Sequence, residues 1–366
     1  MLARTHQPQS FRQQLLHYKQ LIDTDIAVYS KHVTSSTHGQ YGRYAGDVTD
    51  VFLHVLGRGG KRIRGALAIV GYEMCGGHDQ QMIIRAATAL EMINAYILMI
   101  DDIQDRSKLR RGKASADEML ADYHRKQGFH GDAEHGGVSM ALNAALAGNH
   151  AAQTLLAGLS VDAELRLKAL GIINQAMIVT AHGQTLDIVN EQVDTASSED
   201  IDHVLEWKTA YYTFLNPLCV GMVLAGADCE DTDAIRDYAL NTGRAFQITD
   251  DIMGIFGNDE QTGKSALDDI REGKQTVLTD YALTHAAAAD AQFLRSMLGS
   301  KQLSEQEFSR CQAIITDSGA LAHAQRMAKE YVRLAISSLE RGPSHWHEDN
   351  VAFLKDLAHM LLTRAS

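Results

Sequence analysis

Along most of this 366-residue chain, apolar residues recur every three or four positions, the spacing of an amphipathic helix. Between positions 80 and 105, for example, Ala86, Leu90, Ile93 and Ile97 share one helical face. The predicted helices cover residues 11–35, 47–56, 61–74, 80–105, 138–157, 163–190, 201–227, 231–255, 277–298, 303–317, 320–341 and 350–364. No alternating strand pattern competes with them. We therefore predict an all-α fold, a large helical bundle with a central cavity between its helices.

Polar or glycine-rich stretches separate these helices and are expected to be loops. They cover residues 34–46, 124–137, 191–200 and 256–276. The histidines of 124–137 are expected to be solvated and not to bind metal, and the last loop is long enough to form a lid. Pro217 should kink the helix over 201–227, because proline cannot donate the helical hydrogen bond.

Composition favours one domain over the whole chain, 1–366. At about 150 residues per domain the length would suggest two or three. However, there are only 3 prolines, and no proline- or serine-rich linker divides the chain. The chemistry-bearing part lies at about 47–280 and follows an N-terminal extension, 1–46. The net charge of −12 argues against nucleic acid or an anionic membrane as a partner.

The four cysteines (Cys75, Cys219, Cys229 and Cys311) are widely spaced, with no CxxC pair. This spacing is typical of reduced thiols and indicates a cytoplasmic protein. The N-terminal residues lack the apolar core of a signal peptide, and no uninterrupted apolar run reaches the ~18 residues that span a bilayer. We therefore expect no integral membrane segment.

Two acidic clusters stand out, each at the polar end of an apolar helix. Asp101, Asp102 and Asp105 end the helix predicted over 80–105, and Asp250-Asp251 lie near the end of the helix over 231–255. Carboxylates this close repel one another unless a cation or water holds them. Either cluster alone is typical of a solvated helix end. Together they indicate a Mg²⁺-filled mouth over an apolar cavity, because Mg²⁺ prefers carboxylate oxygens and substrate phosphates.

Several further motifs occur in a fixed order with these clusters over residues ~55–280. They are Gly60-Lys61-Arg62-Ile63-Arg64, Asp101-Asp102-Ile103-Gln104-Asp105, Arg110-Arg111-Gly112, Gly183-Gln184 with Asp187, Lys208-Thr209, Phe246-Gln247-Ile248-Thr249-Asp250-Asp251, Gly263-Lys264 and Asp269-Ile270-Arg271-Glu272-Gly273-Lys274. This order and spacing resemble the trans-isoprenyl diphosphate synthases, the polyprenyl synthetase family. The resemblance implies an isoprenoid synthase fold and a prenyltransferase that joins isopentenyl diphosphate to an allylic diphosphate.

The resemblance also implies a role for each motif. Asp101, Asp105 and Asp250 would bind several Mg²⁺ ions, and Asp102 and Asp251 would act through water or through those ligands. Residues implied to hold the allylic diphosphate or assist its reaction are Arg110, Lys208, Thr209, Gln247, Lys264 and Lys274. Residues implied to hold isopentenyl diphosphate are Lys61, Arg64, Asn94 and Arg111, since arginine grips phosphate oxygens in pairs.

Product length in such a family depends on what blocks the cavity below the first acidic cluster. Tyr96 precedes Asp101 by five residues, which is ~7.5 Å along a helix, and Ile97 follows it. An aromatic at this position without a second one resembles the twenty-carbon, geranylgeranyl type. A farnesyl or longer product is the alternative, and a core role for Tyr96 is also open. The family is typically homodimeric.

The chain departs from the family pattern at four positions. Asn94 replaces a histidine or glutamine that is common there, Ile100 stands where many members have histidine, and Gly65 replaces a proline. Gly254 removes the third carboxylate of the second acidic motif and is expected to affect metal affinity more than mechanism. None of the four removes a residue that the chemistry requires.

Two other functions fit parts of the pattern. A terpene cyclase would share the fold and the first acidic motif, but it would lack the isopentenyl site formed by Lys61, Arg64 and Arg111. A non-catalytic regulatory subunit of a heteromeric synthase would have lost aspartates from one motif, whereas both motifs are intact here.

Overall fold

The computed structural model of this chain describes residues 10–227, 233–257 and 267–363. Lys264, one of the predicted substrate-binding residues, lies outside these ranges. The elements are α1 (Phe11–Tyr41), α2 (Arg43–Gly57), α3 (Ile63–Met74), α4 (Gln80–Gln104), β1 (Leu109–Arg110), β2 (Lys113–Ala114), α5 (Ala116–Gln127), α6 (Ala133–Ala157), α7 (Ala163–Asn190), α8 (Ser198–His203), the π-helix η1 (Val204–Leu215), α9 (Asn216–Leu224), α10 (Asp233–Phe256), α12 (Asp268–Glu272), α13 (Val277–His285), α14 (Ala288–Met297), α15 (Glu305–Asp317), α16 (Ala320–Leu339) and α17 (Glu348–Leu362). The predicted all-α fold is confirmed.

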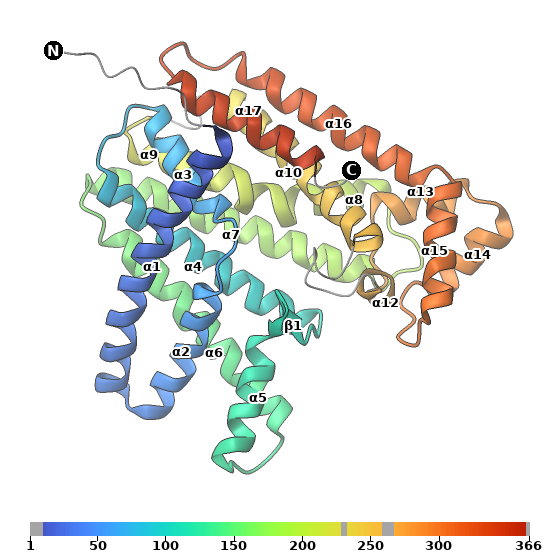
Figure 1. Cartoon of the computed structure of the whole chain (residues 1–366), viewed down its shortest axis with the longest axis horizontal. Helices are drawn as coiled ribbons and strands as arrows, with labels where there is room; N and C mark the ends of the chain where they lie inside the picture. Colours follow the sequence, from blue (N-terminus) through green and yellow to red (C-terminus); the bar gives the residue numbers. More distant parts are fainter. Residues whose placement is uncertain (1–9, 228–232, 258–266, 364–366) are drawn as a thin grey trace.

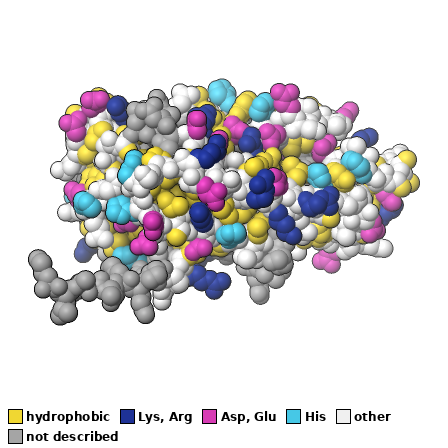
Figure 2. Space-filling model, turned by 90° about the horizontal axis from the view of Figure 1, so that it is seen from above, with side chains coloured by type: hydrophobic (Ala, Val, Ile, Leu, Met, Phe, Trp, Pro, Cys, Tyr) yellow, Lys and Arg dark blue, Asp and Glu magenta, His cyan; other side chains and the backbone are white. Residues whose placement is uncertain are grey.

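The long helices α4, α7 and α10 form the middle of the bundle, and α16 and α17 run along one side of it (Figure 1). α5 and α2 lie toward one end, and α13 to α15 group at the other. Helix α3 is buried over most of its length because nearly all of its residues from Gly65 to Met74 are apolar or glycine. On the face seen in Figure 2, acidic and basic side chains are interspersed and do not form one basic patch.

Helix α4 is long and apolar enough to cross a membrane by length and composition alone, with a mean hydropathy of 1.5 over its best window. However, 67% of that window is buried inside the protein. The same apolarity is what the central helix of a large bundle needs, because neighbouring helices cover it on most sides. We therefore interpret α4 as a core helix.

Two predicted loops are largely helical. The stretch 34–46 continues α1 to Tyr41, and the chain reverses at Gly42, whose φ of 82° favours glycine, before α2 begins. The stretch 124–137 contains the end of α5 and the start of α6, so only its middle is a loop. His124 is buried, whereas His130 and His135 are exposed, so the expectation of solvated histidines was wrong for His124.

The predicted kinked helix 201–227 is instead three consecutive segments: α8, the π-helix η1 and α9. Pro217 is the second residue of α9, which continues directly from η1. The distortion therefore precedes the proline. A π-helix has wider turns than an α-helix and is frequently found at functional sites.

Cys219 is disulfide-bonded, which corrects the prediction that all four cysteines are reduced. Cys75 and Cys311 are free. Spacing along the chain identifies CxxC motifs, but it does not reveal cysteines that meet only after folding.

Candidate active site

A cavity of about 600 Å³ opens between α4, α7, η1 and α10. Most of the predicted site residues line it together: Arg64, Asn94, Tyr96, Ile97, Asp101, Asp105, Arg110, Arg111, Lys208, Thr209, Gln247, Asp250, Asp251 and Lys274. Of the predicted residues that the structure describes, Asp102 and Lys61 do not line it. Asp102 is buried and Lys61 is exposed. The tertiary structure therefore gathers motifs that are up to 210 positions apart, from Arg64 to Lys274, at one cavity.

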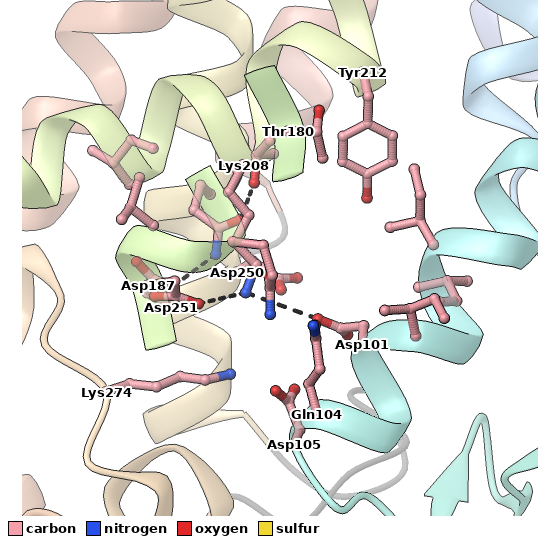
Figure 3. A pocket seen from close by; sticks show the side chains of 18 of the residues that line it. Asp101, Gln104, Asp105, Thr180, Asp187, Lys208, Tyr212, Asp250, Asp251 and Lys274 are labelled. Atoms are coloured by element: carbon pink, nitrogen blue, oxygen red, sulfur yellow. Dashed lines mark hydrogen bonds and ion pairs between the residues drawn. The ribbon is translucent and has the colours of Figure 1, made fainter. Parts of the chain in front are cut away.

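The first acidic cluster forms one wall at the end of α4 (Figure 3). The turn at Arg111-Gly112, where both φ angles are positive, folds β2 back on β1 and holds Arg110 against this wall. Arg110 Nη2 lies 2.9 Å from Asp101 Oδ2 and 2.5 Å from Asp102 Oδ1. Burial acts to lower the pKa of Arg110, but Asp101 and Asp102 outweigh it and raise the pKa above its ordinary value. Arg110 therefore stays charged beside the cavity.

The second acidic pair forms the opposite wall, near the end of α10 (Figure 3). A chain of hydrogen bonds links it to η1. Thr209 Oγ1 donates to Gln247 Oε1 over 2.6 Å, and Gln247 Nε2 donates to Asp251 Oδ1 over 2.8 Å. Burial, with help from the charges of Asp269 and Asp250, raises the pKa of Asp251 to about 8, against the hydrogen bond from Gln247. This linkage fixes the hydroxyl of Thr209 at the cavity surface.

Lys208 lies between the two walls. Its Nζ is 2.5 Å from Asp187 Oδ2 on α7 and 3.8 Å from Asp101 Oδ1 on α4. The approach of η1 to α7 depends on Gly183, because a Cβ there would lie 2.3 Å from the backbone nitrogen of Lys208. Burial acts to lower the pKa of Lys208, but the two carboxylates raise it above its ordinary value. The close packing of η1 against α7 thus explains the glycine in the Gly183-Gln184 motif.

Lys274 approaches the cavity from the segment after α12. Its Nζ lies 3.5 Å from Asp269 Oδ1 and 3.2 Å from Glu272 Oε2. A Cβ on Gly254 would lie 1.9 Å from Asp269 Oδ2, so the Asp269 carboxylate occupies the space that a side chain at position 254 would need. The acidic group that the sequence lacks at Gly254 is therefore matched by one from another segment.

The basic residues predicted for isopentenyl diphosphate lie at the α3 side of the cavity. Arg64 Nη2 donates to Thr213 Oγ1 over 2.7 Å, and its guanidinium carbon lies 4.2 Å from the centre of the Tyr212 ring. Arg111 donates to the carbonyl of Gly59. Burial, reinforced by the charges of neighbouring arginines, lowers the pKa of Arg111, so an anion bound here would relieve repulsion between cations.

Asn94 is buried at the same side of the cavity. Its Oδ1 has no hydrogen-bond partner among the described residues. A buried polar atom without a partner is costly, so a ligand or water that supplies a donor would be favoured there. The predicted position of Asn94 at the binding site agrees with this geometry.

Sequence reasoning missed several residues that lie at the site or close to it. Asp187 and Asp269 were noted within motifs but not assigned to the site, although both line the cavity. Tyr212 also lines it, and its position four residues after Lys208 was the available signal. Glu191 lies close to Asp187 and Lys274, and burial with the charge of Asp187 raises its pKa to about 8. No motif in the sequence pointed to Glu191.

The donor set fits Mg²⁺. Asp101, Asp105 and Asp250 present hard carboxylate oxygens to one cavity, and among the described residues that line it there is no cysteine or histidine. These three carboxylates are not among the groups of described residues whose ligand atoms lie within 4.8 Å of one another.

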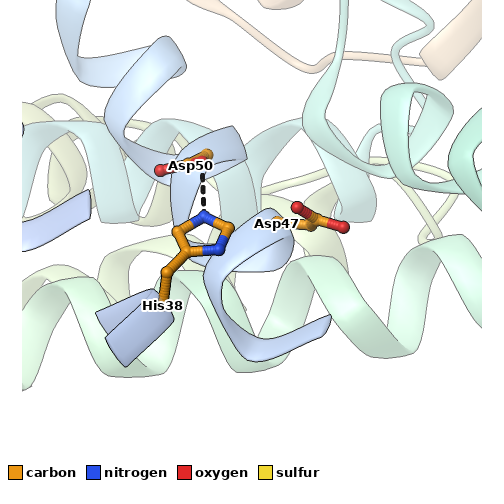
Figure 4. A group of neighbouring side chains, drawn as sticks. All are labelled: His38, Asp47 and Asp50. Carbon is orange, nitrogen blue, oxygen red and sulfur yellow. Dashed lines mark hydrogen bonds and ion pairs between the residues drawn. The ribbon is translucent and has the colours of Figure 1, made fainter. Parts of the chain in front are cut away.

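His38, Asp47 and Asp50 form such a group at the turn between α1 and α2 (Figure 4). His38 Nε2 lies 2.9 Å from Asp50 Oδ2, and Tyr123 donates to Asp47 over 2.7 Å. The missing side chain of Gly46 admits the His38 ring, since a Cβ there would lie 2.3 Å from it. Because the acidic oxygens already accept hydrogen bonds, we interpret this group as a structural link between α1, α2 and α5.

The site has two carboxylate walls, with lysine and arginine side chains between them, over a cavity with apolar lining. These features define a metal-dependent enzyme that acts on a diphosphate of an apolar group. Comparison with known proteins agrees. Residues 47–315 match the polyprenyl synthetase family model. The chain belongs to the polyprenyl synthetase family and is an isoprenyl diphosphate synthase, as the motifs predicted. The matched region extends beyond the predicted end of the chemistry-bearing part at about 280.

Two curated relatives and one solved structure illustrate the similarity. The geranylgeranyl diphosphate synthase of Saccharolobus solfataricus is 29% identical over 87% of this chain and 92% of its own length. The geranylfarnesyl diphosphate synthase of Aeropyrum pernix is 31% identical over 85% and 91%. The crystal structure of a geranylgeranyl pyrophosphate synthase of Corynebacterium glutamicum, complexed with isoprenyl diphosphate and magnesium, has a TM-score of 0.89 and 30% identity, covering 95% of this chain and 98% of that one.

Proposed function

We propose that this enzyme condenses isopentenyl diphosphate with an allylic diphosphate, head to tail and in the trans configuration, to a short-to-medium polyprenyl diphosphate. The twenty-carbon geranylgeranyl diphosphate is the favoured product. The observation that carries the proposal is the pair of carboxylate walls, Asp101 with Asp105 and Asp250 with Asp251, which face one cavity with Lys208 between them (Figure 3). The family's chemistry needs such a pair of walls.

Asp101, Asp105 and Asp250 would hold several Mg²⁺ ions, which when bound neutralise the diphosphate leaving group as Lewis acids. The chain's own cations act at the same place. Arg110 and Lys208 stay charged beside the first wall, as described above, and would hold the allylic diphosphate as it departs. Lys274 and Lys264 are proposed to complete this set.

Isopentenyl diphosphate would bind at the other side of the cavity, to Lys61, Arg64, Asn94 and Arg111. This separation places its double bond beside the allylic carbon and keeps its own diphosphate away from the carboxylate walls. The proton lost after condensation is proposed to pass to the departing diphosphate. Thr209 would assist, because its own proton is donated to Gln247 and its oxygen remains an acceptor.

The length of the product would be set by Tyr96 and Ile97. Both line the cavity on α4, one turn or more before Asp101. The curated relatives named above carry twenty- and twenty-five-carbon product names, which agrees with a medium product. The Tyr96 ring would act as the floor that a growing chain meets.

A homodimer is also proposed, with the exposed face of α6 and α7 as its interface. Leu142 and Leu146 lie one turn apart on α6 and are 42% and 52% exposed. On α7, Leu167, Ile178 and Val189 recur every eleven residues, hence on one face, and are 69%, 52% and 46% exposed. Large apolar side chains grouped on adjacent helices typically meet a partner, and a second copy presents a matching face.

Light scattering would test this interface. Leu146→Arg combined with Ile178→Arg should convert a dimer to a monomer, whereas Leu334→Arg, exposed on α16, should leave it intact. A monomeric wild-type protein, or a double variant that remains dimeric, would refute the proposed interface.

Three further proposals accompany the enzyme assignment. The chain forms one domain, it has no nucleic-acid partner, and it is cytoplasmic. The disulfide at Cys219 weakens the argument for a cytoplasmic location, because that argument depended mainly on reduced thiols.

The decisive experiment is incubation of purified protein with Mg²⁺, labelled isopentenyl diphosphate and each of the three short allylic diphosphates. Chromatography of the dephosphorylated products should show a twenty-carbon alcohol. A cyclic hydrocarbon formed without isopentenyl diphosphate would indicate a terpene cyclase, and no product with any primer would indicate a non-catalytic subunit. Asp101→Ala and Asp250→Ala should each abolish turnover while circular dichroism stays unchanged.

A further inference from the structure

The backbone at Arg62 is left-handed, although the residue is not glycine. Its φ is 53° and its ψ is 38°, and it lies immediately before α3 begins. The side chain of this arginine is 4% exposed. A left-handed backbone at a residue with a side chain is costly and persists only where the surroundings impose it. Lys61 and Arg64, which flank this turn, therefore depend on whatever holds Arg62 in place.

Three groups hold the Arg62 guanidinium, and they come from three helices. Its Nε donates to Asp23 Oδ1 of α1 over 2.8 Å. Its Nη1 donates to Glu91 Oε2 of α4 over 3.3 Å, and its Nη2 to the carbonyl of Leu56 of α2 over 2.8 Å. A buried arginine that lost a carboxylate would be left with an uncompensated charge, so each contact restrains the others.

Gly65 lets α1 pack close to the Arg62 turn. Its backbone N–H donates to Glu91 Oε1 over 3.0 Å, a bond that a proline at this position would lack. A Cβ on Gly65 would lie 2.7 Å from Ile22 Cδ1, so the buried Ile22 of α1 packs where a side chain would otherwise stand. The residue after Ile22 is Asp23. The departure from the family pattern at Gly65 is thus the place where the N-terminal extension joins the turn.

We propose that Asp23 is a positioning residue for isopentenyl diphosphate binding, so that the N-terminal extension is part of this site. Asp23 acts through Arg62: it fixes the left-handed turn that orients Lys61 and Arg64 toward the diphosphate. Asp23 itself does not line the cavity. This inference rests on the proposed function of Lys61 and Arg64.

The test compares Asp23→Ala with Asp25→Ala. Asp25 lies on the same helix, accepts a hydrogen bond from Thr88 over 2.7 Å and pairs with Arg85 over 3.3 Å, but it does not contact Arg62. Both variants remove one carboxylate that docks α1, so a merely structural role would weaken both proteins alike. Thermal unfolding of the two variants measures that shared effect.

Binding of isopentenyl diphosphate alone, without Mg²⁺, is then measured by titration calorimetry, and turnover by steady-state kinetics. We expect Asp23→Ala to weaken this binding and raise the KM for isopentenyl diphosphate by about tenfold, roughly the effect of one charge-assisted hydrogen bond. The KM for the allylic diphosphate and kcat should stay within about twofold, as should every constant of Asp25→Ala. Asp23→Asn keeps one acceptor oxygen, so its KM for isopentenyl diphosphate should lie between those of the wild type and Asp23→Ala. If Asp23→Ala does not fold, Asp23→Asn is compared with Asp25→Ala in its place.

Equal affinity for isopentenyl diphosphate in the Asp23 and Asp25 variants would overturn the positioning role. A parallel change in both KM values and kcat would also overturn it, because that result indicates a general loss of structure. A wild-type protein that binds no isopentenyl diphosphate would instead refute the proposed function and, with it, the role of Asp23.

Discussion

Gly183→Ala should separate α7 from η1 and displace Lys208. The added Cβ would lie 2.3 Å from the Lys208 backbone nitrogen and 2.6 Å from the Trp207 carbonyl carbon. Since non-bonded atoms rest at about 3.5 Å, the two helices must move apart by roughly 1 Å. Both obstacles are backbone atoms, so no side-chain rotation relieves the contact. Overpacking of this kind destabilises by about 1–3 kcal/mol, more than the gain from replacing a helical glycine.

A shift of about 1 Å in a group that positions the substrate lowers the rate by roughly 10²-fold. We therefore expect kcat of Gly183→Ala to fall by about that factor in a steady-state assay with labelled isopentenyl diphosphate. The control is Gly171→Ala on the same helix, where an added Cβ has no atom within 4 Å. It should keep full activity and gain about 0.5–1 kcal/mol of stability. A Gly183→Ala enzyme with kcat within twofold of the control would refute the packing argument.

Three other substitutions or treatments test separate features. Tyr96→Ala should lengthen the product, because it removes the ring below Asp101, and an unchanged alcohol on chromatography would exclude Tyr96 as the floor. Gly254→Ala should weaken Mg²⁺ binding about tenfold, because the added Cβ displaces the Asp269 carboxylate. The weaker binding should appear as a smaller rise in Tm when Mg²⁺ is added. An unchanged rise in Tm would show that Asp269 does not contribute to Mg²⁺ binding. Burial raises the pKa of Cys75 and of Cys311 to about 11, so iodoacetamide should not label them in the native protein at pH 8.5, and labelling should rise only as the pH approaches 11. Mass spectrometry would reveal the contrary result, with urea-unfolded protein as the positive control.

The sequence predicted the type of most helices, and for α4 and α7 also the bounds to within one residue, because long apolar patterns report burial directly. It failed at 34–46 and 124–137, where glycine, serine, threonine and histidine are polar in composition but remain helical under tertiary contacts. It also failed at η1. A π-helix differs from an α-helix only in hydrogen-bond register. The helix η1 packs against Gly183 and Gly243, and the order of apolar and polar residues does not report this packing.

The site divides in the same way. Asp101, Asp250 and Lys208 were predicted because the resemblance places each of them in an ordered motif. Asp269 and Glu191 lie on segments that approach the site only in the folded chain. The linear sequence pattern therefore could not assign them to the site. The disulfide at Cys219 was missed for the same reason.

By itself, the sequence determined the all-α class, the two acidic walls and the chemistry of a diphosphate, since residue type and order carry that information. The tertiary structure decided which groups meet. It brought the Asp269 carboxylate to the space left by Gly254, and Asp23 of the N-terminal extension to Arg62 beside the predicted isopentenyl site. The first contact uses the space that Gly254 leaves open, and the second lies next to Ile22, which packs in the space that Gly65 leaves open. Such space is set only when helices pack.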